Sequence, residues 1–279
     1  MLGCFVLLLL GVEVLLPLVL VASRNRMIFF PSPEPAEQGL PFLDGRVQAS
    51  LVRIRRPDGG ELSAYDARPL AGEDTNGPVV IFCHGNAGNI AWRAPVLAWF
   101  VAKTGARTLL FDYTGYGGNA GKPSEEEVYR DALAAYDHLA AQGVEARRIV
   151  LYGESLGVAV ALKVASERPV AGVVAQSGFS SLSSFTRRIY PWLPLGAWLV
   201  RDAFPSTRRI ATLRAPVLIV HGTADEIIPF AESELLKRAA PAGTVLLPIE
   251  GAGHNDLFEV AGEAYLKLLA ERFRAWAAR

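Results

Sequence analysis

The segment Ile149–Ala161, IVLYGESLGVAVA, decides the fold that we predict for this chain. Its apolar start, Ile149–Tyr152, is typical of a buried strand, and the small apolar residues from Val158 onward are typical of a helix. Between them lies GESLG, a G-x-S-x-G motif in a strand–turn–helix context. We interpret it as a nucleophile elbow, a turn so sharp that a side chain on either glycine would collide with its neighbours. The alternative is an ordinary glycine turn that contains a serine.

Composition excludes several classes of protein. The 279 residues carry 28 basic and 28 acidic side chains, and these are scattered, so nothing suggests a nucleic-acid surface. Cys4 and Cys83 are too few for a disulfide framework. The four histidines lack the spacing of metal ligands. We therefore expect a single α/β domain with no cofactor, no metal and no nucleic-acid partner.

The N-terminus carries a separate signal. Leu2–Ala22 is almost wholly apolar and is long enough to span a bilayer, despite Glu13 and Pro17. No lysine or arginine precedes it, so we predict an uncleaved, single-pass membrane anchor over residues 1–22. The alternative is a signal peptide cleaved before Ser23, which would give a secreted or periplasmic protein. Residues 23–45 contain four prolines and are expected to form an extended connection.

The rest of the chain alternates between short apolar runs and helical patterns. Strands are predicted at Val79–Cys83, Thr108–Asp112, Ile149–Tyr152, Val170–Gln176, Val217–Val220 and Val245–Pro248, and helices at Ala91–Lys103, Ser124–Gln142, Leu156–Glu167, Phe230–Ala239 and Asn255–Ala278. Val47–Arg55 and Glu61–Arg68 predict a hairpin. Such alternation indicates a mainly parallel central sheet flanked by helices, in one domain over residues 46–279.

Three residues that together can perform nucleophilic catalysis each follow a different predicted strand. In a parallel sheet, the carboxyl ends of the strands meet at one edge. Ser155 would be the nucleophile, His254 the base that takes its proton, and Asp225 the acid that orients His254. The chain order Ser, Asp, His is that of α/β-hydrolases. Glu226 and Asp256 are nearby rivals for the role of Asp225.

Two further regions complete the predicted site. The backbone N–H groups of Asn86, in the loop after Val79–Cys83, and of Leu156 are expected to form an oxyanion hole. The glycine-rich HGNAGN around Asn86 lacks the pattern of a phosphate-binding loop. An aromatic-rich insertion at about residues 179–205 would form a short cap. Its Phe179, Trp192 and Trp198 are candidates to contact an acyl chain.

The motifs HGNAGN, FDYTGYG, GESLG, HGTAD and GAGHND together resemble the α/β-hydrolase superfamily, in particular the membrane-tethered serine hydrolases of the fungal polarity-linked and animal protein-depalmitoylase type. The similarity runs from about Met27 to the C-terminus. It implies an α/β-hydrolase fold and a Ser-Asp-His triad. Thr114 stands where these relatives usually have arginine, and Asn119 where serine often follows, which leaves open how those loops are supported.

From these observations we predict a serine hydrolase that cleaves carboxylic ester or thioester bonds through an acyl-Ser155 intermediate. The substrate would be a small-molecule or lipid-like acyl ester or thioester, and the N-terminal helix would contact the membrane. An amide or peptide hydrolase of the same fold is one alternative. A catalytically silent, membrane-tethered binding module is another. The oligomeric state is left open.

Overall fold

The computed structural model describes residues 25, 26, 28–70, 76–189, 200 and 203–279. The predicted anchor, residues 1–22, lies outside these ranges. Within them, no helix is both long enough and apolar enough to cross a membrane. The N-terminal apolar helix therefore has no support from the structure and stays a prediction.

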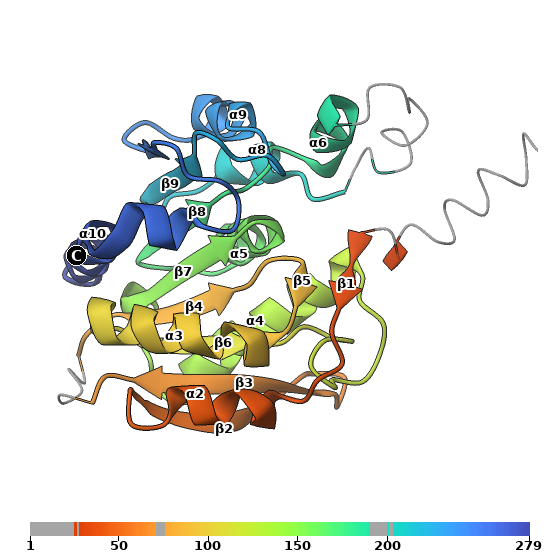
Figure 1. The fold of residues 1–279 in the computed structure, drawn as a ribbon, viewed down its shortest axis with the longest axis vertical. Helices are drawn as coiled ribbons and strands as arrows, with labels where there is room; N and C mark the ends of the chain where they lie inside the picture. The colour runs from red at the N-terminus through yellow and green to blue at the C-terminus, as the bar shows by residue number, and fades with distance from the viewer. Residues whose placement is uncertain (1–24, 27, 71–75, 190–199, 201–202) are drawn as a thin grey trace, which may run out of the picture.

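An eight-stranded sheet forms the centre of the molecule (Figure 1). Its spatial order is β10-β9-β8-β7-β4-β6-β3-β2, and all neighbouring pairs are parallel except β2 with β3 and β3 with β6. The strands are β2 (Gln48–Arg55), β3 (Glu61–Arg68), β4 (Val79–Cys83), β6 (Arg107–Phe111), β7 (Ile149–Glu154), β8 (Gly172–Gln176), β9 (Val217–Gly222) and β10 (Val245–Ile249). Both parallel neighbours of β4 come later in the chain: β6 lies on one side of it and β7 on the other. The order in which strands are added therefore reverses at β4. The crevice at the carboxyl ends of β4 and β7 is where such sheets place their ligands.

Helices cover both faces of this sheet (Figure 1). One face carries η1 (Ala36–Gly39), α2 (Leu40–Leu43), α3 (Ile90–Thr104) and α10 (Leu257–Ala277), and the other carries α4 (Glu125–Ala141), α5 (Leu156–Glu167), α8 (Ser206–Ile210) and α9 (Ala231–Ala239). The short η2 (Ala146–Arg148) precedes β7, and α6 (Leu182–Ile189) lies in the predicted cap. Gly262 interrupts α10 with φ 60° and ψ −158°, so its first turns point in a different direction from the rest.

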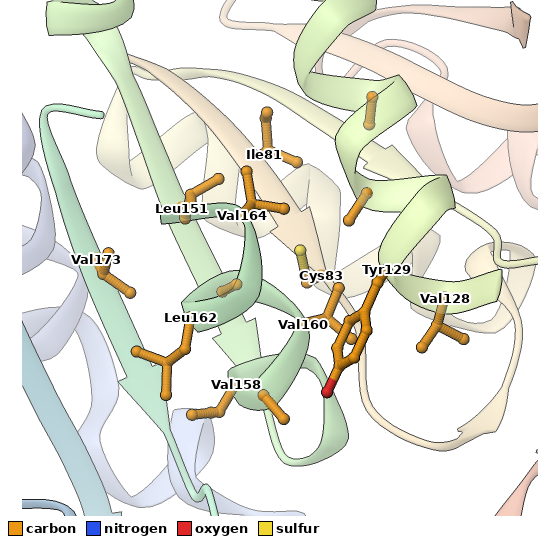
Figure 2. Close-up of a cluster of buried hydrophobic side chains, with 14 of the residues drawn as sticks. Ile81, Cys83, Val128, Tyr129, Leu151, Val158, Val160, Leu162, Val164 and Val173 are labelled. Carbon is orange, nitrogen blue, oxygen red and sulfur yellow. The ribbon is translucent and has the colours of Figure 1, made fainter. Parts of the chain in front are cut away.

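Successive side chains of the parallel strands point to opposite faces of the sheet and belong to two separate apolar cores. On β4, Ile81 and Cys83 belong to the core beneath α4 and α5, whereas Phe82 belongs to the core beneath α3 and α10. Figure 2 shows the first core, where valine and leucine side chains of α5 meet Ile81, Leu151 and Val173 of the sheet. Since α5 is packed on nearly all sides, it is the helix held most firmly against the sheet.

The segment predicted as an extended connection, residues 23–45, is partly regular instead. β1 (Phe30–Pro31) pairs in parallel with β5 (Ala87–Gly88), and η1 and α2 pack against α3. The apolar side chain of Leu43 is buried, and Pro41 occupies the first turn of α2, where a missing N–H costs nothing. This segment is therefore part of the folded domain, held by its contacts with β5 and α3.

The two loop residues that depart from the relatives' pattern are well supported. Thr114 donates from its backbone N–H to Asp131 Oδ2 (2.6 Å) and from its hydroxyl to Asp131 Oδ1 (3.0 Å). Arg56 lies beside Thr114, and its guanidinium is 3.0 Å from Asp131. Asn119 accepts from Ser63 N–H (3.0 Å) and donates to the Asp112 carbonyl (2.9 Å). The loop at Thr114 thus has a cation beside it, supplied by Arg56 at the end of β2.

Replacing Arg56 by methionine is expected to destabilise the fold by about 1–3 kcal/mol, because it removes the cation from the fully buried Asp131, whose pKa burial already raises to about 7. Adding Asp131→Asn to the Arg56→Met variant should recover part of that loss of stability. The control is Arg147→Met, whose ion pair with Glu145 is fully exposed to solvent and should contribute little to stability. Urea unfolding measures all three. Equal losses for Arg56 and Arg147 would contradict the account.

Candidate active site

Ser155 occupies a strained turn between β7 and α5, with φ 55° and ψ −116°. A Cβ atom on Gly153 would lie 2.4 Å from the Gly157 carbonyl oxygen, and one on Gly157 would lie 1.9 Å from the Cys83 carbonyl oxygen. Both distances are far below van der Waals contact, so both positions require glycine. The predicted collision on each side of the serine is confirmed.

Ser155, His254 and Asp225 form one hydrogen-bonded chain. His254 Nε2 is 3.1 Å from Ser155 Oγ, and His254 Nδ1 is 2.8 Å from Asp225 Oδ2. The three residues follow β7, β10 and β9 respectively, so the fold brings them together from distant parts of the sequence. This is the spatial arrangement that their order along the chain predicted.

Asp225 is held in place through both of its oxygens. Oδ1 accepts the backbone N–H groups of Ile227 (2.9 Å) and Ile228 (2.7 Å), while Oδ2 faces His254. Burial disfavours the ionised carboxyl, but hydrogen bonds from His221 and His254 outweigh it, so the pKa of Asp225 lies below its ordinary value. An ionised carboxylate only accepts. His254 therefore carries its proton on Nδ1, and its Nε2 is free to accept the Ser155 hydroxyl proton.

Neither rival acid is hydrogen-bonded to His254. Asp256 Oδ1 accepts from the Gly253 backbone N–H at 2.7 Å, and Glu226 has no hydrogen bond to His254. Asp112, after β6, accepts from the Ile90 backbone N–H in the first turn of α3, which Asn89 caps. In the part of the chain that the structure describes, no group of three or more His, Cys, Asp or Glu side chains is placed to hold a metal ion.

His221 is a member of the site that our sequence analysis did not single out. Its Nε2 is 2.7 Å from the Ile228 carbonyl oxygen and 3.1 Å from Asp225 Oδ2, and its Nδ1 contacts the Ser233 hydroxyl. Because a carbonyl only accepts, Nε2 bears the proton, and this N–H is shared between the Ile228 carbonyl and Asp225 Oδ2. Asp225 is therefore flanked by two histidine N–H groups. The HGTAD motif places His221 at the end of β9, four residues before Asp225, and that spacing was the available signal.

Two backbone N–H groups lie close to the nucleophile in the chain or in space: Leu156 follows Ser155 directly, and Asn86 follows Gly85, where a Cβ atom would lie 3.4 Å from Ser155 Cβ. No described residue accepts a hydrogen bond from the backbone N–H of Asn86 or of Leu156. The loop that carries Asn86 is braced, because the Asn86 side chain donates to the Ile28 carbonyl and accepts from the Tyr116 hydroxyl. His84 Nδ1 contacts the Gly85 carbonyl at 2.7 Å, and burial lowers the pKa of His84. The buried, neutral ring of His84 thus supports the loop.

The predicted substrate-contacting aromatics are only partly described. Phe179 is buried and packs against Phe185 and Phe204, with ring centroids 6.0 and 6.1 Å away. Trp192 and Trp198 lie outside the described residues. A role of Phe179 in contacting substrate stays a prediction, since its visible neighbours are other core aromatics.

Comparison with protein families gives a match over residues 75–209 to the family described as serine aminopeptidase, S33. An uncharacterised protein of Mycobacterium tuberculosis is 41% identical over 236 residues, which cover 84% of this chain and 82% of that protein. The α/β hydrolase domain-containing protein aho-3 of Caenorhabditis elegans is 30% identical over 252 residues, covering 84% of this chain and 73% of that protein.

Solved structures show the same architecture. An esterase of Pyrococcus furiosus superposes with a TM-score of 0.66 at 22% identity, covering 83% of this chain and 93% of that one. The esterase domain of a Rhodothermus marinus protein superposes with a TM-score of 0.59 at 24% identity, covering 82% and 98%. These likenesses concern the fold. Together with the relatives in sequence, they show that this chain belongs to the α/β-hydrolase superfamily.

Proposed function

We propose that this hydrolase is a serine esterase or thioesterase that works through an acyl-Ser155 intermediate. The observation that carries the proposal is the hydrogen-bonded chain from Ser155 Oγ through His254 to Asp225. A serine hydroxyl is a weak nucleophile unless a neighbouring base removes its proton. Here the base is in contact with the hydroxyl, and its acceptor nitrogen is set by the acid behind it.

Each step of the reaction has a group in position. His254 Nε2 takes the proton as Ser155 Oγ attacks the carbonyl carbon, and the resulting oxyanion accepts from the Asn86 and Leu156 N–H groups. His254 then gives that proton to the departing alcohol or thiol, whose bond to the acyl carbon breaks. In the second half, His254 takes a proton from water, hydroxide attacks the acyl-serine, and Ser155 regains its proton as the acid leaves.

Amide or peptide hydrolysis is the second candidate, and the match to the serine aminopeptidase family favours it. An aminopeptidase needs an uncompensated acid near the nucleophile to bind the substrate ammonium. Glu154, directly before Ser155 in the chain, lies 4.0 Å from Arg93, which offsets its charge and makes this acid a poor partner for an ammonium group. A panel of matched esters, thioesters and anilides separates the two. A catalytically silent binding module does not require the hydrogen bonds that link Ser155, His254 and Asp225, so their presence argues against that alternative.

Replacing Ser155 by alanine should abolish labelling by a fluorophosphonate probe and lower kcat for ester hydrolysis on the order of 10⁵–10⁶-fold. His254→Ala should cost nearly as much, and the double variant little more, because the residues act as one unit. Ser166→Ala, on the exposed side of α5, is the matched control and should keep full labelling. Labelling that survives in Ser155→Ala would refute the assignment of the nucleophile.

Asp225→Asn is expected to lower kcat about 10⁴-fold with little change in substrate binding, because an amide permits the wrong tautomer of His254. Asp256→Asn and Glu226→Gln should stay within a few-fold of wild type, since neither side chain contacts His254. Steady-state kinetics on one ester compare the three. If kcat falls severely in Asp256→Asn or Glu226→Gln while Asp225→Asn remains active, that residue and not Asp225 is the acid that orients His254.

We further propose that residues 1–22 anchor the enzyme to a membrane. A chain that begins at Ser23 keeps every described residue, so its kcat/KM on a short water-soluble ester should equal that of the full chain. On an acyl ester held in vesicles it should be much slower, because anchoring raises the local concentration of enzyme at the surface. Carbonate extraction and paired assays test this. If expression of the full-length chain instead yields a soluble protein that starts after Ala22, residues 1–22 are a cleaved signal peptide.

A further inference from the structure

A cavity of about 170 Å³ lies beside His254, between α3 and the first turn of α10. The two helices pack side by side on the same face of the sheet (Figure 1). The wall is mainly apolar and is formed by Phe82, Val96, Leu97, Leu110, Leu257 and Phe258. The cavity is thus large enough for a compact apolar group, since an engineered cavity of about 150 Å³ holds benzene.

Besides His254 and Asn255, the wall has three polar side chains. Arg93 and Glu154 face each other at 4.0 Å, so their charges largely cancel. Gln176 is 2% exposed, and its Oε1 accepts from the hydroxyls of Tyr152 and Tyr265. No described residue accepts a hydrogen bond from Gln176 Nε2. Because Gln176 lines the cavity, this amide donor is open to water or a ligand there. The wall therefore suits an uncharged ligand.

The position of the cavity indicates which half of an ester it takes. His254 must hand its proton to the leaving-group oxygen, so that oxygen lies within hydrogen-bond distance of His254 Nε2. His254 and Asn255 line the cavity, whereas the oxyanion donors at Asn86 and Leu156 do not. A group attached to the leaving oxygen is therefore next to the mouth of the cavity.

We propose that this cavity binds the alcohol or thiol part of the substrate and selects an uncharged, compact apolar group about the size of a benzene ring. The inference rests on the proposed ester or thioester hydrolysis and adds the class of leaving group. It assigns a specificity role to Val96 and Phe258, which contact neither the nucleophile nor the oxyanion donors.

Two ester series test the assignment. The first varies the alcohol on a fixed acetyl group, from methyl through butyl to benzyl, and the second varies the acyl chain on a fixed methyl ester. In the wild type, kcat/KM should rise along the alcohol series up to benzyl. Val96→Phe fills the cavity from its rim without disturbing the core, because Val96 is 37% exposed. It should lower kcat/KM on benzyl acetate about tenfold more than on methyl acetate, the discrimination expected of an apolar pocket.

Val260→Phe is the matched control, a half-exposed valine of α10 that does not line the cavity, and it should leave both series unchanged. A selective effect of Val96→Phe on the acyl series, or an equal effect on both series, overturns the assignment while ester hydrolysis stands. If the wild type hydrolyses neither series and takes no fluorophosphonate label, the proposed function fails and this inference fails with it.

Discussion

The close contact between the start of α5 and the end of β4 is the constraint on which the site depends. At Gly157 the backbone of α5 approaches the Cys83 carbonyl so closely that no side chain fits between them. This contact turns the chain sharply at Ser155 and brings the first N–H of the helix next to the loop after β4. The buried residues of α5, Leu156–Leu162 and Val164, hold the helix against the core, and this packing balances the strain at Ser155.

The acid side of the site is organised by hydrogen bonds instead of close packing. Asp225 receives two backbone N–H groups on one oxygen and two histidine N–H groups on the other. Every lone-pair direction of the carboxylate is therefore used, and the group cannot rotate away from His254. His221 has both of its nitrogens engaged, so it fixes the acid without taking part in the proton transfers that we assign to His254.

Sequence patterns that involve only neighbouring residues predicted their strands and helices well. The bounds predicted for β3, β4 and α5 agree with the structure, because uninterrupted apolar runs and glycine turns are local signals. Ser124 also begins α4 as expected, by accepting from the Glu127 N–H. The Glu127 side chain does not reach back to cap Ser124 but binds Arg56, a charge supplied by a distant part of the chain.

Features that depend on tertiary contacts escaped prediction. The two-residue pairing of β1 with β5 and the helical turns η1 and α2 are too short to leave a periodic signal, and they exist because α3 offers a surface to pack on. The cavity beside His254 depends on where α3 meets the start of α10, across the break at Gly262. Ser155, Asp225 and His254 were predictable because each closes its own strand, so topology alone brings them together.

The central claim is that Ser155 carries the acyl group. The most direct test is to mix the enzyme with a slowly deacylating ester, quench in acid within the first turnover, and map the modified peptide by mass spectrometry. The account predicts one acyl adduct per chain, on Ser155, which disappears as the product acid accumulates. An adduct on another residue, or product formed with no acyl-enzyme in single-turnover experiments on a series of esters, would contradict it.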